Sequence, residues 1–170
     1  MKNFNSNTDN SEEWLTPPEL LKLLGPFDLD PCAPVERPWP MAKNHYTKLE
    51  NGLSKPWLGR VWLNPPYGRK TFDWLEKLSM HKDGVALIFA RTETQGFHSQ
   101  IWEKADSVFF FKGRLKFHHL SGEQGGAANA PSCLVSYSGK DTAIIEKAIE
   151  KGMKGKLVYV NIPVEFGKCV

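Results

Sequence analysis

The segment Asn64-Pro65-Pro66-Tyr67 combines residue types and spacing that are well suited to chemistry. Each proline fixes its own φ and disfavours the helical conformation in the residue before it, so Asn64 and Pro65 should both be extended. A segment this stiff can direct two acceptors outward, the amide oxygen of Asn64 and the carbonyl oxygen of Pro65, beside the aromatic face of Tyr67. A planar aromatic amine would fit this arrangement.

Such an amine is a poor nucleophile, because its lone pair is delocalised into the ring. Two acceptors that bind its two hydrogens would localise the lone pair and direct it at an electrophile, while stacking on Tyr67 would fix the plane of the ring. No strong base is required, since the proton can leave after the new bond has formed. The alternative is a rigid turn without chemistry, but the position directly after an apolar strand and before a helix favours function.

The apolar periodicity predicts the elements that position this segment. A short helix should begin at Thr16-Pro17-Pro18-Glu19, with Thr16 as its N-cap, and end at Leu24 before Gly25-Pro26. Further helices are predicted at 71–81, 94–104 and 141–151, and strands at 27–30, 60–63, 85–90, 107–111, 132–137 and 157–162. The segments 31–40 and 122–131 are predicted to be irregular. This alternation indicates an α/β fold with an open, mostly parallel sheet flanked by helices.

Asp30 and Asn64 each follow a predicted strand. Open α/β sheets bind their ligands at the carboxyl ends of their strands, so these two residues are the first candidates for a site.

Length and composition indicate a single globular domain. A chain of 170 residues with 41% hydrophobic and 24% charged residues can bury a core, whereas the Asn- and Ser-rich residues 1–11 should form a disordered tail ahead of a domain at 12–170. The polar N-terminus and the lack of a long apolar run predict a cytoplasmic protein without a membrane partner. The net charge of +3 permits a nucleic-acid partner without indicating one. Cys32, Cys133 and Cys169 are expected to be free thiols, and no metal is expected because His118-His119 lacks further ligands.

The chain resembles the small bacteriophage-type DNA N-6-adenine methyltransferases of the Dam group, within the amino-methylating class of S-adenosylmethionine-dependent methyltransferases. The resemblance covers the chain from Trp14 to about Tyr137. Several motifs in one order carry it, namely Trp14-Leu15-Thr16-Pro17-Pro18, Leu29-Asp30-Pro31-Cys32-Ala33, Asn51-Gly52-Leu53 ahead of Pro56-Trp57, Asn64-Pro65-Pro66-Tyr67-Gly68, Ala90-Arg91-Thr92-Glu93-Thr94 and Gly113-Arg114-Leu115-Lys116-Phe117. It implies a single-domain, Rossmann-like class I methyltransferase fold of reduced size.

The resemblance also implies a set of site residues. The catalytic corner that holds an extruded adenine would be Asn64, Pro65, Pro66 and Tyr67. The residues implied to bind S-adenosylmethionine are Trp14, Thr16, Pro17, Asp30, Pro31, Cys32, Ala33 and Asn51. Thr16 is equally explained as a helix cap, and Asn51-Gly52 as a plain turn. Asp30 has the alternative of capping the proline-rich turn, but a carboxylate at a strand end can accept from the cofactor's ammonium or hydroxyls, which favours function. The chain departs from the general methyltransferase pattern because Gly25 precedes the first strand and no Gly-rich loop follows it.

The substrate implied by the resemblance is double-stranded DNA, in the setting of phage or prophage DNA modification. Arg91, Arg114 and Lys116 suit a phosphate backbone, although Arg91 is equally able to pair with Glu93. Phe117 is a candidate for the second face of the adenine slot opposite Tyr67, although a Phe at a strand end is more commonly buried. Only the loops 34–55 and 122–131 remain to read bases, so loose specificity and a homodimer are both open. The alternatives are methylation of RNA adenine or of protein glutamine, and a nucleic-acid-binding module without activity.

Overall fold

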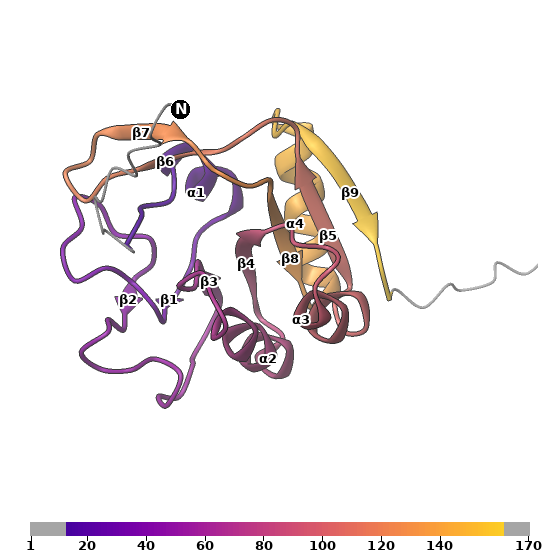
Figure 1. The fold of residues 1–170 in the computed structure, drawn as a ribbon, viewed down its shortest axis with the longest axis horizontal. Helices are drawn as coiled ribbons and strands as arrows, with labels where there is room; N and C mark the ends of the chain where they lie inside the picture. The colour runs from indigo at the N-terminus through magenta and orange to yellow at the C-terminus, as the bar shows by residue number, and fades with distance from the viewer. Residues whose placement is uncertain (1–12, 162–170) are drawn as a thin grey trace, which may run out of the picture.

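A seven-stranded sheet organises residues 13–161, the part of the chain that the computed structural model describes (Figure 1). Its order is β2-β1-β3-β4-β8-β5-β9. The strands are β1 (Leu29–Asp30), β2 (Asn44–His45), β3 (Val61–Leu63), β4 (Gly84–Phe89), β5 (Ser107–Phe111), β8 (Ser132–Ser136) and β9 (Gly155–Tyr159). The predicted α/β class is confirmed.

The sheet is mixed, which corrects the prediction of a mostly parallel one. The pairs β2–β1, β1–β3 and β3–β4 are parallel, whereas β4–β8, β8–β5 and β5–β9 are antiparallel. The reason is that β8 lies between β4 and β5. It is reached from β5 through the hairpin of β6 (Lys116–His118) and β7 (Gln124–Ala127), and antiparallel neighbours need no crossover helix.

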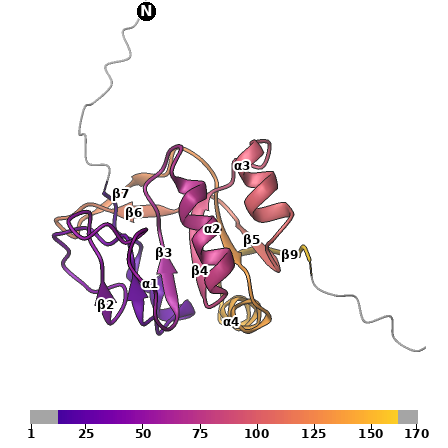
Figure 2. The ribbon, with the colours of Figure 1, turned by 90° about the horizontal axis from the view of Figure 1, so that it is seen from below.

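Helices cover both faces of the sheet (Figure 2). On one face, α1 (Pro18–Leu24) and α4 (Gly139–Glu150) contact each other and pack on a core that includes Trp62, Leu87 and Phe109. On the other face lie α2 (Thr71–His81), α3 (Gln95–Phe97) and the π-helical η1 (His98–Trp102). β8 is buried along its whole length because it lies between two strands and two helical layers, which explains its apolar sequence.

Most predicted elements are confirmed, with three differences. The predicted helix 94–104 divides into α3 and η1, and Thr94 is the N-cap of α3, since its side chain accepts a hydrogen bond from Phe97 N. The predicted Thr16 cap is wrong: Pro17 is the N-cap of α1, and the Thr16 hydroxyl instead accepts from Trp62 Nε1 at 3.2 Å. The segment 122–131 was predicted to be irregular but contains β7, and β2 and β6 were not predicted, because a two-residue strand and a Gly- and Ala-rich strand carry no periodicity.

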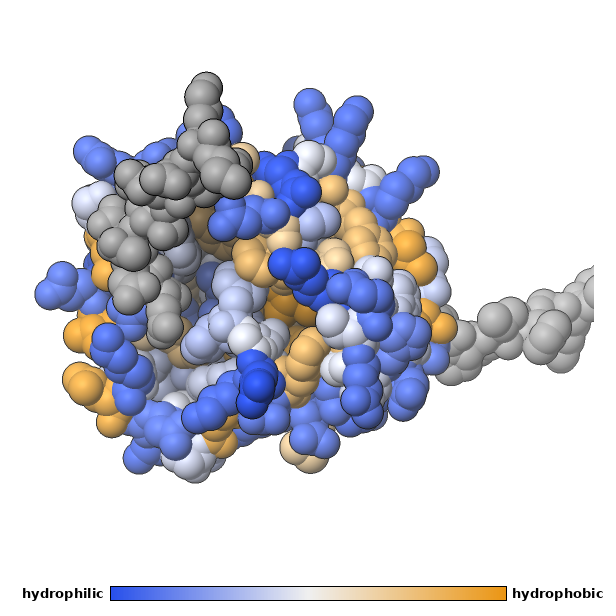
Figure 3. All heavy atoms as spheres, viewed as in Figure 1, coloured by the Kyte–Doolittle hydropathy of each residue, from blue (hydrophilic) through white to orange (hydrophobic). Residues whose placement is uncertain are grey.

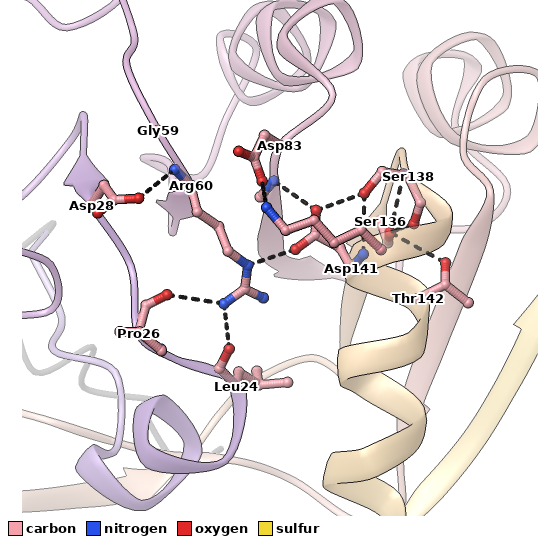
Figure 4. Close-up of polar contacts among 12 residues, drawn as sticks. Leu24, Pro26, Asp28, Gly59, Arg60, Asp83, Ser136, Ser138, Asp141 and Thr142 are labelled. Carbon is pink, nitrogen blue, oxygen red and sulfur yellow. Dashed lines mark hydrogen bonds and ion pairs between the residues drawn. The ribbon is translucent and has the colours of Figure 1, made fainter.

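A buried ion pair joins the elements at the amino ends of β3 and β4 (Figure 4). Arg60 Nε lies 2.7 Å from Asp141 Oδ1, and the two side chains are 7% and 0% exposed. Arg60 Nη1 also donates to Leu24 O and Pro26 O, while Asp141 Oδ2 accepts from Gly84 N at 2.8 Å. The pair therefore ties α1, β3, β4 and α4 together at the edge of the sheet opposite to the carboxyl ends.

The predicted tail 1–11 and Cys169 lie outside the described residues. Cys32 and Cys133 are free, as predicted. None of the helices in the described part of the chain is long and apolar enough to cross a membrane.

Candidate active site

A cavity of about 280 Å³ lies at the carboxyl ends of β1 and β3, where parallel strands place Asp30 and Asn64 side by side. Its volume is close to the lower end of the range for small-molecule sites. Eleven of the sixteen predicted site residues line it: Trp14, Thr16, Asp30, Pro31, Cys32, Ala33, Asn51, Asn64, Pro65, Pro66 and Tyr67. The structure thus brings the predicted catalytic corner and most of the predicted cofactor residues to one cavity.

The corner at Asn64 is fixed from both sides. Its Nδ2 lies 3.5 Å from Trp14 O, and its Oδ1 accepts a long hydrogen bond of 3.4 Å from the Tyr67 hydroxyl. Behind the corner, the Thr71 hydroxyl donates to Pro66 O at 2.8 Å and accepts from Gly68 N at 3.0 Å. The first residue of α2 therefore holds the Pro-Pro segment in place, so the orientation of Asn64 does not depend on the prolines alone.

Tyr67 is stacked on a residue that the sequence did not single out. Its ring lies 3.9 Å from that of Phe89, at the end of β4, with an interplanar angle of 7°. Tyr67 remains 36% exposed, while loss of solvent around its hydroxyl raises the pKa of this group. The hydroxyl is therefore protonated at neutral pH and acts as a donor toward Asn64.

Asp30 and Cys32 connect the ends of β1 and β3. The Cys32 amide donates to Asp30 Oδ1 at 3.1 Å, and the Cys32 thiol donates to Asn64 O at 3.2 Å. Burial raises the pKa of Asp30 to about 7, and burial together with the neighbouring Asp30 raises the pKa of the Cys32 thiol. Cys32 is thus a neutral donor that positions Asn64, whereas Asp30 is a carboxyl group that gains or loses its charge close to neutral pH.

Asp30 should destabilise the ligand-free protein at neutral and alkaline pH. Its pKa is about 7 in the folded protein, above the value of 3.8 expected without burial, so stability falls as the pH rises between these values and the loss is complete above pH 7. We expect Asp30→Asn to raise the free energy of unfolding by about 1–2 kcal/mol at pH 8. At pH 4 the variant and the parent protein should be equally stable in urea unfolding, and an equal gain at both pH values would contradict this assignment.

The N-terminal segment forms another wall of the cavity. Trp14 and Thr16 line it, and the Trp62 hydrogen bond holds Thr16 in a place where it is 1% exposed. Pro17, at the N-cap of α1, does not line the cavity. Of the two residues predicted to contact the cofactor here, Thr16 and Pro17, only Thr16 lines the cavity.

Several lining residues were not predicted. Glu13 and Lys48 form an ion pair of 3.4 Å, and Lys70 contributes a further exposed cation. The other unpredicted lining residues are Pro34, Met41, Thr47, Gly52, Leu53, Trp62 and Trp74. Only Lys70 had a signal in the sequence, since it is a cation three residues after Tyr67. Most of the others lie on loops, whereas Trp62 on β3 and Trp74 on α2 reach the cavity through the packing of their elements.

None of the four predicted substrate residues lines the cavity. Arg91, Arg114 and Lys116 are exposed, and Arg91 forms no ion pair with Glu93 within residues 13–161. Phe117 is 6% exposed and packs in the core near Leu15, so its ring is not available opposite Tyr67. The cause is strand alternation, because β6 directs Phe117 inward and Lys116 outward.

Within residues 13–161, no group of three or more His, Cys, Asp or Glu side chains is arranged to hold a metal.

Comparison with known proteins agrees with this geometry. The family model described as DNA N-6-adenine-methyltransferase (Dam) matches residues 4–138, which is most of the chain. Searches of curated proteins and of solved structures gave no match. The matched region includes every element that lines the cavity. The chain therefore belongs to the DNA N-6-adenine-methyltransferase (Dam) family.

Proposed function

We propose that this chain transfers a methyl group from S-adenosylmethionine to the exocyclic amine of adenine in DNA, on a reduced Rossmann-like framework. The observation that carries the proposal is the placement of Asn64 and Tyr67 at the carboxyl end of β3, on the same cavity as the buried Asp30. Family membership supports adenine in DNA as the substrate. The cavity is the proposed binding place of the second ligand, S-adenosylmethionine, next to the base.

The lining residues fit S-adenosylmethionine, whose amino group and sulfonium are cationic. Asp30 is 2% exposed and accepts one backbone hydrogen bond, but no cation pairs with it among residues 13–161. A buried carboxylate without a counter-ion is costly, and an ammonium or hydroxyl ligand would relieve that cost. Trp14 and Asn51 would add an aromatic surface and an amide for the remaining groups. When bound, the cofactor supplies an electrophilic methyl group.

The residues of the corner then act on the base. Asn64 Oδ1 and the carbonyl of Pro65 accept the two amine hydrogens, which localises the lone pair of the amine. The incoming amine displaces the Tyr67 hydroxyl from Asn64 Oδ1, a small loss because that hydrogen bond is 3.4 Å long. As the new C–N bond forms, the bond from the methyl carbon to the donor breaks and its electron pair leaves with the donor. The excess amine proton then passes from the acceptors to solvent.

A base inside a duplex cannot reach this corner, so we propose that adenine is extruded from the helix. The cations Lys48 and Lys70 on the cavity, together with the exposed Arg91, Arg114 and Lys116, are the proposed phosphate contacts. In Figure 3, hydrophilic residues surround an apolar area near the middle of this face of the molecule.

Phe89 should affect turnover through Tyr67. Removing its ring in Phe89→Ala leaves the Tyr67 ring free to rotate, and we expect kcat to fall by about tenfold while the Kd for S-adenosylmethionine changes little. Stopped-flow or single-turnover methylation of a duplex oligonucleotide would measure the loss. Phe89→Tyr, which keeps a ring in place, is the matched control and should retain most of the activity.

The proposal is tested by offering the purified protein DNA, RNA and protein substrates with tritiated S-adenosylmethionine. We expect label in DNA, and mapping of the modified plasmid should locate it on the exocyclic amine of adenine. Label in RNA or protein alone would assign a different substrate, and the lack of cofactor binding in a calorimetric titration would overturn the assignment as an enzyme.

A further inference from the structure

We infer that Lys77 is a positioning residue for the cofactor wall, the part of the cavity formed by Asn51 and the segment 52–55. The inference depends on the proposed binding of S-adenosylmethionine in this cavity. Lys77 lies on α2 and does not line the cavity. Its ammonium group nevertheless holds the segment 52–55, and Gly52 and Leu53 of this segment do line the cavity. The contact acts through the backbone, so no motif reveals it.

The ammonium group of Lys77 binds three carbonyl oxygens of this one segment. Nζ donates to Leu53 O at 2.7 Å, to Gly52 O at 3.3 Å and to Lys55 O. An ammonium group has three N–H donors, and here all three have a backbone acceptor. Three bonds from one cation to neighbouring residues hold the segment in one conformation, which a single hydrogen bond could not do.

Trp57 supports the same segment. Its Nε1 donates to Gly52 O at 2.9 Å, and Lys77 Nζ lies 4.9 Å from the centre of its ring. Trp57 is also stacked on Trp74, which lines the cavity, with ring centres 6.2 Å apart. Lys77 and Trp57 therefore form a support behind the wall, on the side away from the ligand.

Gly52 shows how closely this wall is placed against the rest of the site. A Cβ at Gly52 would lie 1.9 Å from Pro31 O, so the segment contacts the loop that carries Asp30 and Cys32 without space for a side chain. A small movement of 52–55 would therefore move Asn51 and open the cavity beside Pro31. The three carbonyl bonds of Lys77 oppose that movement.

The position of Lys77 on α2 relates this wall to the catalytic corner. The same helix holds Pro66 through Thr71 at its first turn and the segment 52–55 through Lys77 later along its length. A helix is rigid over this distance, so α2 sets the separation between the base-binding corner and the cofactor wall. Correct separation is what a reaction between two bound molecules requires.

The charge state of Lys77 gives this role a specific pH dependence. No carboxylate pairs with Lys77 within the described residues, and burial lowers its pKa below the ordinary value of 10.5. A neutral amine has only two N–H donors, so deprotonation leaves one of the three carbonyls without its partner. The groups in contact with the ammonium are the carbonyls of 52–55 and the ring of Trp57, which do not titrate. The titratable group next to them is His81 on the same helix, whose ring packs edge-on against that of Trp57 with centres 5.9 Å apart.

The test is calorimetric titration of S-adenosylmethionine into the whole protein, Lys77→Met and Lys147→Met. Methionine keeps the apolar stem of Lys77 and removes its donors, while Lys147 is an exposed helical lysine on α4, which makes it the matched control. We expect the Kd for the cofactor to rise about tenfold in Lys77→Met and to stay within about twofold in Lys147→Met. The KM for DNA should change much less.

A second readout needs no variant. Between pH 7.5 and 10 the Kd of the parent protein should rise at the alkaline end, while its melting temperature without ligand shows that the fold persists. In Lys77→Met, where it folds, the rise should be smaller, because only the titration of the cofactor's own amino group remains. A Kd in Lys77→Met equal to that of the parent, or an equal alkaline rise in Kd in the variant and the parent, would overturn the inference. No binding by the parent protein would instead refute the proposed function, so the two failures are distinguishable.

Discussion

Replacing Asn64 with alanine should lower the rate of adenine methylation by about 10²- to 10³-fold, the loss expected when one of the oriented groups that stabilise developing charge is removed. Asn64 Oδ1 is the side-chain acceptor of the proposed corner and lies within reach of Tyr67 on the same cavity. The carbonyl of Pro65 remains in the variant but can bind only one of the two amine hydrogens. The lone pair of the amine would then stay delocalised into the purine.

Single-turnover methylation at saturating cofactor measures this loss directly, because it separates the chemical step from binding and product release. The Kd for S-adenosylmethionine should change little, since the proposed cofactor residue Asp30 and the Cys32 hydrogen bond to Asn64 O do not involve the Asn64 side chain. Activity within tenfold of the parent would show that the corner does not activate the amine. A collapse of cofactor binding would mean that Asn64 supports the cavity instead.

Replacing Arg60 with methionine should lower the free energy of unfolding by about 3–5 kcal/mol, because it leaves the Asp141 carboxylate buried without its cation. Asp141 is 0% exposed, and the remaining partners of its carboxylate, Gly84 N and the Ser138 hydroxyl, are neutral (Figure 4). The lost contacts also include the Arg60 bonds to Leu24 O and Pro26 O. This loss is a large fraction of the stability of a typical domain.

Urea unfolding measures the change, and an exposed ion pair in the same protein provides the control. Lys43 and Asp28 are 2.8 Å apart, but their side chains are 68% and 39% exposed, so Lys43→Met should cost less than about 1 kcal/mol. Combining Arg60→Met with Asp141→Leu should recover part of the loss, since it removes the unpaired charge. Similar losses for Arg60→Met and Lys43→Met would show that the buried pair has no special role.

Turnover of Arg60→Met below its melting range should be close to that of the parent, because the pair lies at the opposite ends of the strands from the cavity.

Local sequence patterns predicted the elements of this fold well. The helix 71–81 and the strand 107–111 agree with α2 and β5, because a helix with one apolar face and a run of buried strand residues are properties of contiguous residues. The Asn64-Pro65-Pro66-Tyr67 corner is a similar case, since proline stiffness acts on immediate neighbours. The strand ends at Asp30 and Asn64 were sufficient to place both on one cavity.

The predictions that failed depend on contacts between distant segments. Thr16 has a suitable sequence for a helix cap, but Trp62, far along the chain, takes its hydroxyl. Phe117 is suited by type to stack on a base, yet β6 turns it into the core, and Phe89 stacks on Tyr67 instead. The insertion of β8 between β4 and β5 made the sheet mixed. Periodicity contains no information about which strands become neighbours.

The residue types and their local spacing were enough to predict the α/β class, most helices and strands, and the corner that faces the cavity, because these follow from backbone stiffness and from the repeat of apolar residues along one segment. Packing in three dimensions determined the cavity, the raised pKa of Asp30 and the roles of Lys77 and Arg60. Burial and a hydrogen bond to a backbone carbonyl depend on what the fold brings together. The sequence around Lys77 or Arg60 therefore resembles that of any surface lysine or strand-end arginine.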